Sequence, residues 1–371
     1  MTNLYEYGVI GCGLVGSAAA KYLAQTGAKV AVLGPQIGPQ SSPLKLFNSH
    51  DDQTRIFRTL DDDAQWAEWA KASVGRYQLI EAESGISFAS KGSCLVVRDH
   101  PRNFDKMDTI ARENQSKYHR VGEHDLLQLL DGVTANAICP LEARLENESA
   151  GILNPRQMLK AQQALARRYG ADFIDAISMG LSSQAGSIDL VTDAGKFHFK
   201  KVLYCLGPYS PFSPILPPAK VLGRTLTLFE IPPSLLERFR LSYPVIFQAK
   251  GFDVYVVPPT KYPDGKFYLK VGGDPDDFEL ETLNDVSNWF HSAGRPSASK
   301  FHQEALEQIY PALKFTSVST QPCAVSQTAT GKPFLGRGSV EHTWGFTGCS
   351  GSAAKSSDEI GRLAASMISD Q

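Results

Sequence analysis

The glycine-rich segment near the N-terminus has the residue types and spacing needed to hold phosphate groups. Gly11, Gly13 and Gly16 form the pattern G-x-G-x-x-G directly after an apolar run, with Leu14 and Val15 between the last two glycines. Gly11 permits a tight turn, Gly13 lets the backbone approach a pyrophosphate, and Gly16 lets the next helix pack closely on the strand. The free N–H groups at the start of that helix would attract the phosphates. The pattern predicts a bound dinucleotide, either NAD(P) or FAD.

The flanks of the glycine pattern support this prediction, with one departure. Apolar residues recur at helical spacing from residue 18 to 23, and residues 30–33 follow as a second buried strand. That strand ends on Gly34, whereas dinucleotide-binding units usually place an acidic residue about 20 residues after the glycines to bind the ribose. Losing such a contact, worth about 1.5–3 kcal/mol, would weaken cofactor binding. The departure argues against NAD as the cofactor.

The composition is that of a globular protein with a small partner. The 371 residues exceed the usual size of one core, so we expect two domains. Apolar residues make up 42% and charged residues 20%, and the net charge is −2 without basic runs. Because nucleic-acid binding depends on clustered Lys and Arg, we exclude nucleic acid as a principal partner. The sequence favours a small-molecule substrate.

The ends and the cysteines give expectations about location and metals. The first predicted strand begins by about Tyr7, which leaves no room for a signal peptide, and no run reaches the roughly 18 apolar residues that span a bilayer. We expect a cytoplasmic, soluble monomer with no membrane partner. The six cysteines include no C-x-x-C and lie near no His cluster, so neither a metal site nor a disulfide framework is expected. Most of them are interpreted as small core residues.

The order of predicted elements indicates two interwoven domains in an α/β fold. A long helix is predicted from about Asp61, and short β pieces separated by glycine are predicted at residues 86–97. A helix starts at Asn154-Pro155, and an apolar strand ends at Gly207. Later segments rich in β-branched and aromatic residues predict an antiparallel sheet. We expect an FAD-binding Rossmann-like domain and a second domain built on that antiparallel sheet.

The domain boundaries follow the changes of pattern along the chain. The FAD-binding domain is assigned to residues 1–85, 150–216 and 317–371, and the substrate domain to residues 86–149 and 217–316. The chain would then leave the FAD-binding domain and return to it twice. A site between them is the natural place for chemistry.

Several ordered motifs give the sequence a resemblance to a known family. It resembles the flavin amine oxidases of the monomeric sarcosine oxidase family, within the D-amino acid oxidase and glycine oxidase group, and the likeness runs nearly end to end. The motifs are the G-x-G-x-x-G segment, residues 54–58, the strand ending at Gly207, Lys270, residues 321–323, and residues 345–348 followed by Lys355. Several motifs in the right order are more specific than one.

The resemblance implies a cofactor and a way of holding it. In that family the flavin is FAD, often bound through its 8α-methyl group to a cysteine, and Cys323 falls at the matching position. The family pattern also places Gly207 and Gly348 at the cofactor. The alternative for Cys323 is an ordinary buried core residue. A covalent link would also make the missing acid at Gly34 tolerable.

The resemblance further implies roles for charged side chains. Arg55 resembles the arginine beside the flavin, and Arg58 resembles the one that binds the substrate carboxylate, a duty suited to a planar guanidinium with paired donors. Lys355 resembles the second carboxylate contact, although a loop two residues longer after Gly348 leaves its register open. Tyr255 resembles a substrate-facing tyrosine. Without the family pattern, the two arginines would be interpreted as a solvated charged loop.

Lys270 resembles the lysine near the flavin edge where oxygen is reduced. One-electron transfer to oxygen makes superoxide, and a cation about 4 Å away would stabilise that charge by roughly 4 kcal/mol at an effective dielectric constant near 20. This corresponds to about a thousandfold in rate. The alternative is a surface lysine at a strand end.

The predicted function is therefore that of an FAD-dependent oxidase of amino acids, with secondary or N-substituted amines favoured. Hydride transfer to flavin N5 would give an imine, and O2 would be reduced to hydrogen peroxide. Three alternatives stay open at this point: a flavin-dependent amino- or hydroxy-acid dehydrogenase that does not use oxygen, an NAD(P)-dependent dehydrogenase, and a non-catalytic dinucleotide-binding protein.

Overall fold

The glycine-rich segment lies at the centre of the first of two sheets. The computed structural model describes residues 4–35, 51–99, 102–130, 141–184, 186–239, 243–276 and 278–370. The path of the first sheet is β17 (Phe334–Arg337), β18 (Thr343–Thr347), β10 (Gly195–Tyr204), β1 (Leu4–Ile10), β2 (Val30–Leu33) and β7 (Asp172–Ile174). Two further strands extend it beside β10, namely β9 (Ser187–Thr192) and β8 (Ser178–Gln184).

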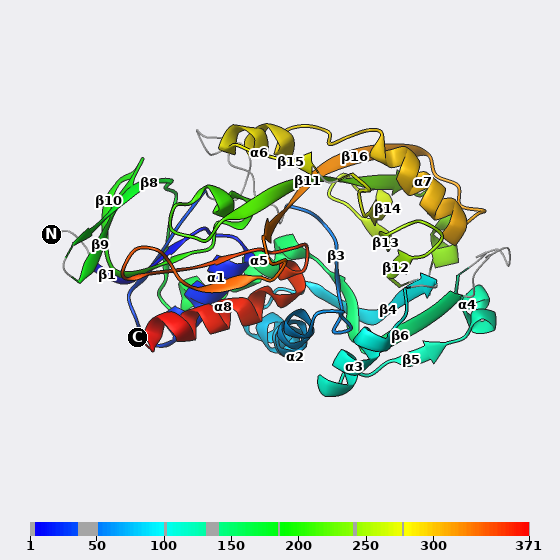
Figure 1. The fold of residues 1–371 in the computed structure, drawn as a ribbon, viewed down its shortest axis with the longest axis horizontal. Coiled ribbons are helices and arrows are strands. Elements are labelled where there is room, and N and C mark those ends of the chain that lie inside the picture. The colour runs from blue at the N-terminus through cyan, green and yellow to red at the C-terminus, as the bar shows by residue number, and fades with distance from the viewer. Residues whose placement is uncertain are drawn as a thin grey trace.

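The core of this sheet is parallel and is covered by helices. Strand β1 pairs in parallel with β10 and β2, so the carboxyl ends of these strands meet at one edge. The covering helices are α1 (Leu14–Gln25), α2 (Ala64–Ser84), α5 (Pro155–Arg168) and α8 (Ala353–Ser369). Helix α1 packs against α8 and α5, as Figure 1 shows. This arrangement confirms the predicted Rossmann-like α/β unit.

The second sheet forms the other end of the elongated molecule (Figure 1). Its path is β15 (Phe278–Glu279), β11 (Ala219–Glu230), β14 (Phe267–Gly272), β13 (Val254–Lys261), β12 (Val245–Gln248), β4 (Ala89–Asp99), β6 (Leu141–Leu153) and β3 (Arg55–Phe57). Strand β16 (Ser317–Thr328) pairs with β11, and β5 (His119–Val121) pairs with β6. The pairings are antiparallel apart from β12 with β4, in agreement with the predicted antiparallel sheet.

Shorter helices surround the second sheet. They are α3 (Asp105–Glu113), α4 (Glu123–Leu129), α6 (Leu283–Phe290), α7 (Ala298–Ile309) and the 3-10 helices at Gly207–Phe212 and Pro233–Phe239. A large apolar core joins α7 to the sheet, and a second apolar core lies between α1, α8 and the first sheet. Among the described residues, no helix combines the length and hydrophobicity needed to cross a bilayer.

Local chemistry sets the helix ends that position the site. Helix α2 starts three residues later than predicted because the Asp63 carboxylate accepts hydrogen bonds from Gln65 N and Trp66 N, at 3.0 and 3.2 Å. Helix α5 starts as predicted, with Asn154 Oδ1 accepting from Gln157 N. Residues 86–97, predicted as short pieces, instead belong mainly to the single eleven-residue strand β4, because β6 supplies a continuous pairing partner apart from one bulge.

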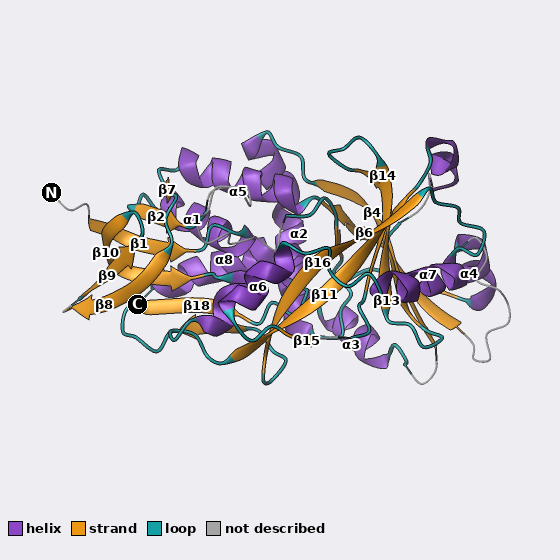
Figure 2. Cartoon of the chain, turned by 90° about the horizontal axis from the view of Figure 1, so that it is seen from above, coloured by secondary structure: helices purple, strands orange, loops and turns teal. Residues whose placement is uncertain are grey.

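Two strands connect the sheet arrangement to the site. Strand β11 pairs with β16 over the full length of both, in the middle of the molecule (Figure 2). Strands β3 and β16 belong to the second sheet, although they come from ranges that the sequence analysis assigned to the FAD-binding domain. The division into domains stays a prediction. Both strands bring candidate site residues, Arg55 and Cys323, to the junction of the two sheets.

Candidate active site

A single cavity of about 1430 Å³ extends from the first sheet to the second. It exceeds the roughly 300–1,000 Å³ typical of small-molecule pockets, so it has room for a dinucleotide together with a substrate. The predicted site residues that line it are Gly11, Gly13, Leu14, Val15, Gly207, Arg55, Arg58, Tyr255, Cys323 and Lys355. Folding therefore brings the phosphate-binding and substrate-binding candidates to one space.

The glycine loop leaves the start of α1 open to that cavity. A Cβ atom on Gly11, where φ is +108°, would lie 2.2 Å from Cys205 O, and one on Gly16 would lie 1.9 Å from Gly11 O. Gly13 is the N-cap of α1, and no side chain of the described residues caps the helix there. The first N–H groups of α1 are therefore available for an anion. Gly348 has a φ of +81° in the turn between β18 and α8.

The unusual Gly34 has a steric explanation. A Cβ atom at this position would lie 2.9 Å from Cys12 Sγ and 3.0 Å from Cys12 N. The Cys12 thiol is buried and donates a hydrogen bond to Pro35 O at 3.0 Å. Because Cys12 occupies the adjacent space, an acidic side chain at residue 34 could not be accommodated without moving the glycine loop.

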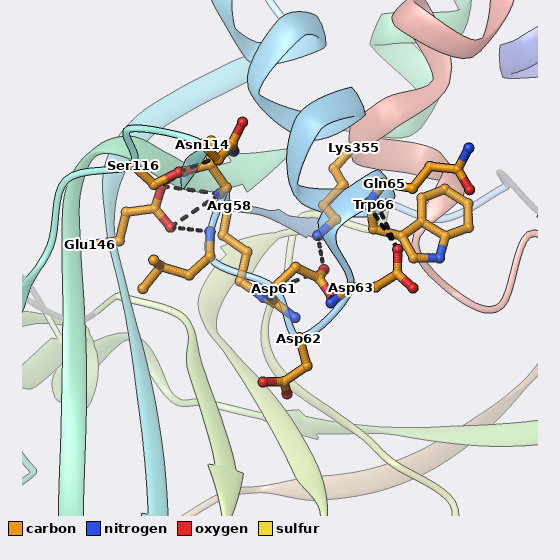
Figure 3. A network of polar contacts seen from close by, with 12 residues as sticks. Arg58, Asp61, Asp62, Asp63, Gln65, Trp66, Asn114, Ser116, Glu146 and Lys355 are labelled. Atoms are coloured by element: carbon orange, nitrogen blue, oxygen red, sulfur yellow. Dashed lines mark hydrogen bonds and ion pairs between the residues drawn. The ribbon is translucent and has the colours of Figure 1, made fainter. Parts of the chain in front are cut away.

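Arg58, Asp61 and Lys355 form a charged cluster beside the cavity (Figure 3). Lys355 Nζ lies 2.6 Å from Asp61 Oδ2, and Arg58 Nη1 lies 3.4 Å from the same oxygen. Burial favours the neutral acid, but the charges of Lys355 and Arg58 outweigh it and lower the pKa of Asp61 to about 2. Burial lowers the pKa of Lys355, and the Asp61 carboxylate opposes that shift. The cluster therefore holds a resident carboxylate between its two cations.

Buried hydrogen bonds hold this cluster in place. Both carboxylate oxygens of Glu146 accept from Thr59 N, at 3.0 and 3.1 Å, and Leu60 N donates to one of them at 3.1 Å (Figure 3). Tyr77 Oη donates to Lys355 O at 2.6 Å, which fixes the start of α8 against α2. The segment after β3 and the first turn of α8 are thereby held rigidly beside each other.

Lys270, Asp52 and Arg55 form a second charged cluster on the side of the second sheet. Lys270 is fully buried, and its Nζ lies 2.9 Å from Asp52 Oδ2 and also donates to Thr54 O. The Arg55 guanidinium contacts the same Asp52 oxygen. Burial, together with the nearby Arg55 charge, lowers the pKa of Lys270 well below its ordinary value. Lys270 lies behind the cavity wall, 5.8 Å from the centroid of the Tyr255 ring.

The cysteines separate into two groups. Cys12, Cys94 and Cys205 are buried, as expected of core residues, whereas Cys323 and Cys349 are partly exposed. The cavity is lined by both partly exposed cysteines and also by Cys12 and Cys205. Cys139 lies outside the described residues. The backbone at Cys323 is held by Trp289 Nε1, which donates to its carbonyl oxygen at 2.7 Å. The sequence analysis did not single out Cys349. Its sulfur accepts a hydrogen bond from Ser326 N at 3.3 Å.

The comparison with protein families decides the family of this chain. A model described as DAO, FAD dependent oxidoreductase, matches residues 6–367. The chain belongs to the DAO family. This confirms the resemblance at the level of the D-amino acid oxidase group, and it confirms FAD as the cofactor and an oxidoreductase as the class of enzyme. The comparison with curated proteins gave no match.

Solved structures show that the DAO fold extends over the whole chain. L-proline dehydrogenase from P. horikoshii is 18% identical, with a TM-score of 0.80, and the match covers 100% of this chain and 94% of that one. NikD, an amino acid oxidase essential for nikkomycin biosynthesis, is 17% identical with a TM-score of 0.76, covering 99% and 94%. Glycine oxidase from Bacillus cereus is 15% identical with a TM-score of 0.72, covering 99% and 95%. These likenesses establish the fold.

The residues of this DAO chain fit FAD. The uncapped N-terminus of α1 and the close-packed Gly11 suit a pyrophosphate, and the volume of the cavity suits the whole cofactor. The sequence analysis missed Asp52 and Asp61, each of which contacts two of the predicted cations. The sequence did contain a pattern that could have indicated them, because each aspartate stands three residues from one of the two arginines.

Proposed function

We propose that this protein is an FAD-dependent oxidase of amino acids, with secondary or N-substituted amino acids as the favoured substrates and an imine and hydrogen peroxide as products. The observation that carries the proposal is the single cavity, which joins the phosphate-binding end of α1 to the Arg58–Asp61–Lys355 cluster. When bound, FAD supplies the hydride acceptor and the route by which electrons reach oxygen.

The charged side chains on the cavity wall would bind and orient the substrate. Arg58 and Lys355 both line the cavity and would hold the substrate carboxylate, Arg58 through paired N–H donors and Lys355 through a single ammonium group. Fixing the carboxylate at two points orients the carbon whose hydride is lost. Tyr255, also on the wall, would contact the rest of the substrate.

The second cluster would serve the oxygen step. Lys270 is buried, where an electrostatic interaction is stronger than in water, and its ammonium group pairs with Asp52. Arg55, which contacts the same Asp52 oxygen, lines the cavity. The proposed role of Lys270 is to stabilise the negative charge that forms when oxygen accepts an electron. Cys323, partly exposed on the cavity wall, is the proposed point of thioether attachment for the flavin.

Colour and acid precipitation test the cofactor part of this proposal. The purified protein should be yellow, and the colour should stay in the pellet after acid precipitation. Cys323→Ser should release the colour into the supernatant, whereas the matched variant Cys349→Ser, which changes the other partly exposed cysteine on the cavity wall, should leave it in the pellet. Acid-released flavin in the unaltered protein would contradict attachment, and a colourless protein would contradict the function.

A substrate panel tests the reaction. N-methyl, N-carboxymethyl and cyclic amino acids should give hydrogen peroxide under air. Because only the unprotonated amine has a lone pair to assist hydride loss, the rate at saturating substrate should rise with pH, and a flat rate between about pH 6 and 9 would contradict this mechanism.

A dehydrogenase that does not use oxygen is the second candidate. It is favoured by the burial of Lys270 behind the cavity wall and by its ion pair with Asp52, which offsets its charge. A dehydrogenase would reduce an artificial electron-accepting dye under nitrogen with the same amino acids, and would form little peroxide in air.

A further inference from the structure

We propose that Asp61 sets the charge of the carboxylate-binding cluster, so that the site accepts substrates with one acid group and disfavours dicarboxylic ones. The inference rests on the proposed function, which places the substrate carboxylate at Arg58 and Lys355. It adds a specificity-determining residue that does not itself line the cavity.

The contacts make Asp61 a shared partner of both cations. Its Oδ2 lies 2.6 Å from Lys355 Nζ and 3.4 Å from Arg58 Nη1 (Figure 3). Asp61 is 9% exposed and Lys355 is 5% exposed, so the pair is largely removed from water. Both cations line the cavity, and Asp61 is not among the lining residues. A ligand in the cavity therefore meets the cations, while Asp61 acts on it through them.

The neighbouring acids contact other groups. Asp62 pairs with Arg98, and Asp63 caps α2 and contacts Lys332. Glu146 is buried close to the cluster, and burial raises its pKa; its hydrogen bonds are made to Thr59 and Leu60, and it acts on Arg58 and Lys355 through its charge rather than by contact. Asp61 is thus the acid that directly contacts the two cations, and the three contacting groups carry a single net positive charge.

A single net positive charge matches a ligand with one carboxylate. A second carboxylate at the same place would be taken out of water without a matching cation, which is unfavourable. Replacing Asp61 by Asn would keep the shape and, at a pH where Lys355 stays protonated, raise the net charge by one. Because an electrostatic interaction is proportional to the ligand's charge, a dianion should gain twice as much binding free energy as a monoanion.

The experiment measures binding of acetate and malonate to the flavin-loaded protein at about pH 7, by calorimetry and by the change in flavin absorption. Asp61→Asn should bind acetate about tenfold and malonate about a hundredfold more tightly than the unaltered protein. Asp63→Asn is the matched control, since it removes the same charge two residues away and keeps a good helix cap, and it should leave both affinities within about twofold. Lys355→Met lowers the net charge of the cluster and should weaken the binding of malonate more than that of acetate. This variant keeps the test decisive if Asp61→Asn does not fold.

The possible failures are distinguishable. If Lys355→Met weakens both acids but Asp61→Asn leaves the malonate-to-acetate ratio unchanged, the carboxylate site stands and the role of Asp61 is wrong. If Lys355→Met and an Arg58→Met variant bind both acids as the unaltered protein does, the carboxylate site of the proposed function is wrong, and the inference falls with it. The inference would also be overturned if Asp63→Asn changed the malonate-to-acetate affinity ratio as much as Asp61→Asn does. The effect would then not depend on contact with the two cations.

Discussion

The two buried lysine–aspartate pairs differ in what can reach them. Lys355, on α8, pairs with Asp61 and lines the cavity, whereas Lys270, on β14, pairs with Asp52 and lies behind the wall. In each cluster one carboxylate serves two cations, the second being Arg58 or Arg55. A ligand can therefore touch Lys355, while Lys270 can act only through its electric field. Under the proposed function, position in the fold more than residue type would assign one pair to binding and the other to charge stabilisation.

Removing the Lys270 charge should give the largest effect. Lys270→Met should slow the reaction of reduced protein with oxygen by at most about a thousandfold, since a cation about 4 Å away would contribute roughly 4 kcal/mol to a developing negative charge and Lys270 acts from behind the wall with Asp52 beside it. Anaerobic reduction by substrate should change by less than about threefold. Stopped-flow absorbance measures both steps separately. Lys266→Met, at an exposed lysine paired with Glu230, is the control, and an unchanged oxygen step in Lys270→Met would remove the proposed role.

Removing the Lys355 charge should affect the opposite step. Lys355→Met should raise KM for an amino acid substrate by about 10- to 100-fold, since a charge-assisted contact of about 1.5–3 kcal/mol is lost. The oxygen step should stay as it was. Steady-state kinetics and reoxidation rates measure the two, with Lys332→Met, a lysine paired with Asp63, as the control. A loss of oxygen reactivity in Lys355→Met would break the division between the clusters.

The carboxylate beside Lys270 should control a pH dependence. Burial and Arg55 already lower the pKa of Lys270. Asp52→Asn removes the carboxylate that pairs with the Lys270 ammonium group, and an opposite charge in contact favours the charged form. Because lysine is charged below its pKa, the loss should appear at high pH: the oxygen reaction of the variant should fall below that of the unaltered protein as the pH rises, and the two should converge as the pH falls. Asp51→Asn, whose carboxylate pairs with Arg156, should keep the normal profile. Parallel pH profiles in all three proteins would contradict the charge-holding role of Asp52.

The smallest effect should be a stability difference seen only in acid. Asp61 has a pKa of about 2 in the folded protein against 3.8 ordinarily. A lowered pKa gives stability that is present above the ordinary value and is lost as the pH falls through the folded value, here about 2 kcal/mol. Urea unfolding between about pH 5 and 2 should therefore show a steeper loss in the unaltered protein than in Asp61→Asn. Equal slopes would show that the cluster does not stabilise the ionised form of Asp61.

The parts of the fold that the sequence predicted correctly depend on neighbouring residues. A few consecutive residues set three local features, namely the tight turn at Gly11, the close packing at Gly16 and the helix cap at Asn154. These features can therefore be predicted without the rest of the chain. The start of α2 was predicted three residues early, because the choice between Asp61 and Asp63 as cap depends on which carboxylate is occupied elsewhere.

The two clusters required contacts between distant parts of the chain. Lys270 meets Asp52 across 218 residues, and Lys355 meets Asp61 across 294. The loop that is two residues longer before Lys355 left its register open in the sequence, and the packing of α8 against α2 places it at the cavity. The spacing of acids three residues from Arg55 and Arg58 was visible, but the same spacing also occurs in solvated loops.

The sequence alone determined that the chain contains a dinucleotide-binding unit, because that depends on residue type and short-range spacing. The two arginines, two lysines and one cysteine became candidates for flavin chemistry through the resemblance to a family. The tertiary structure decided which aspartate neutralises which cations and which lysine faces the cavity. Those outcomes depend on burial and on charges from distant segments, since the strength of an ion pair is set by its distance and by the water excluded around it.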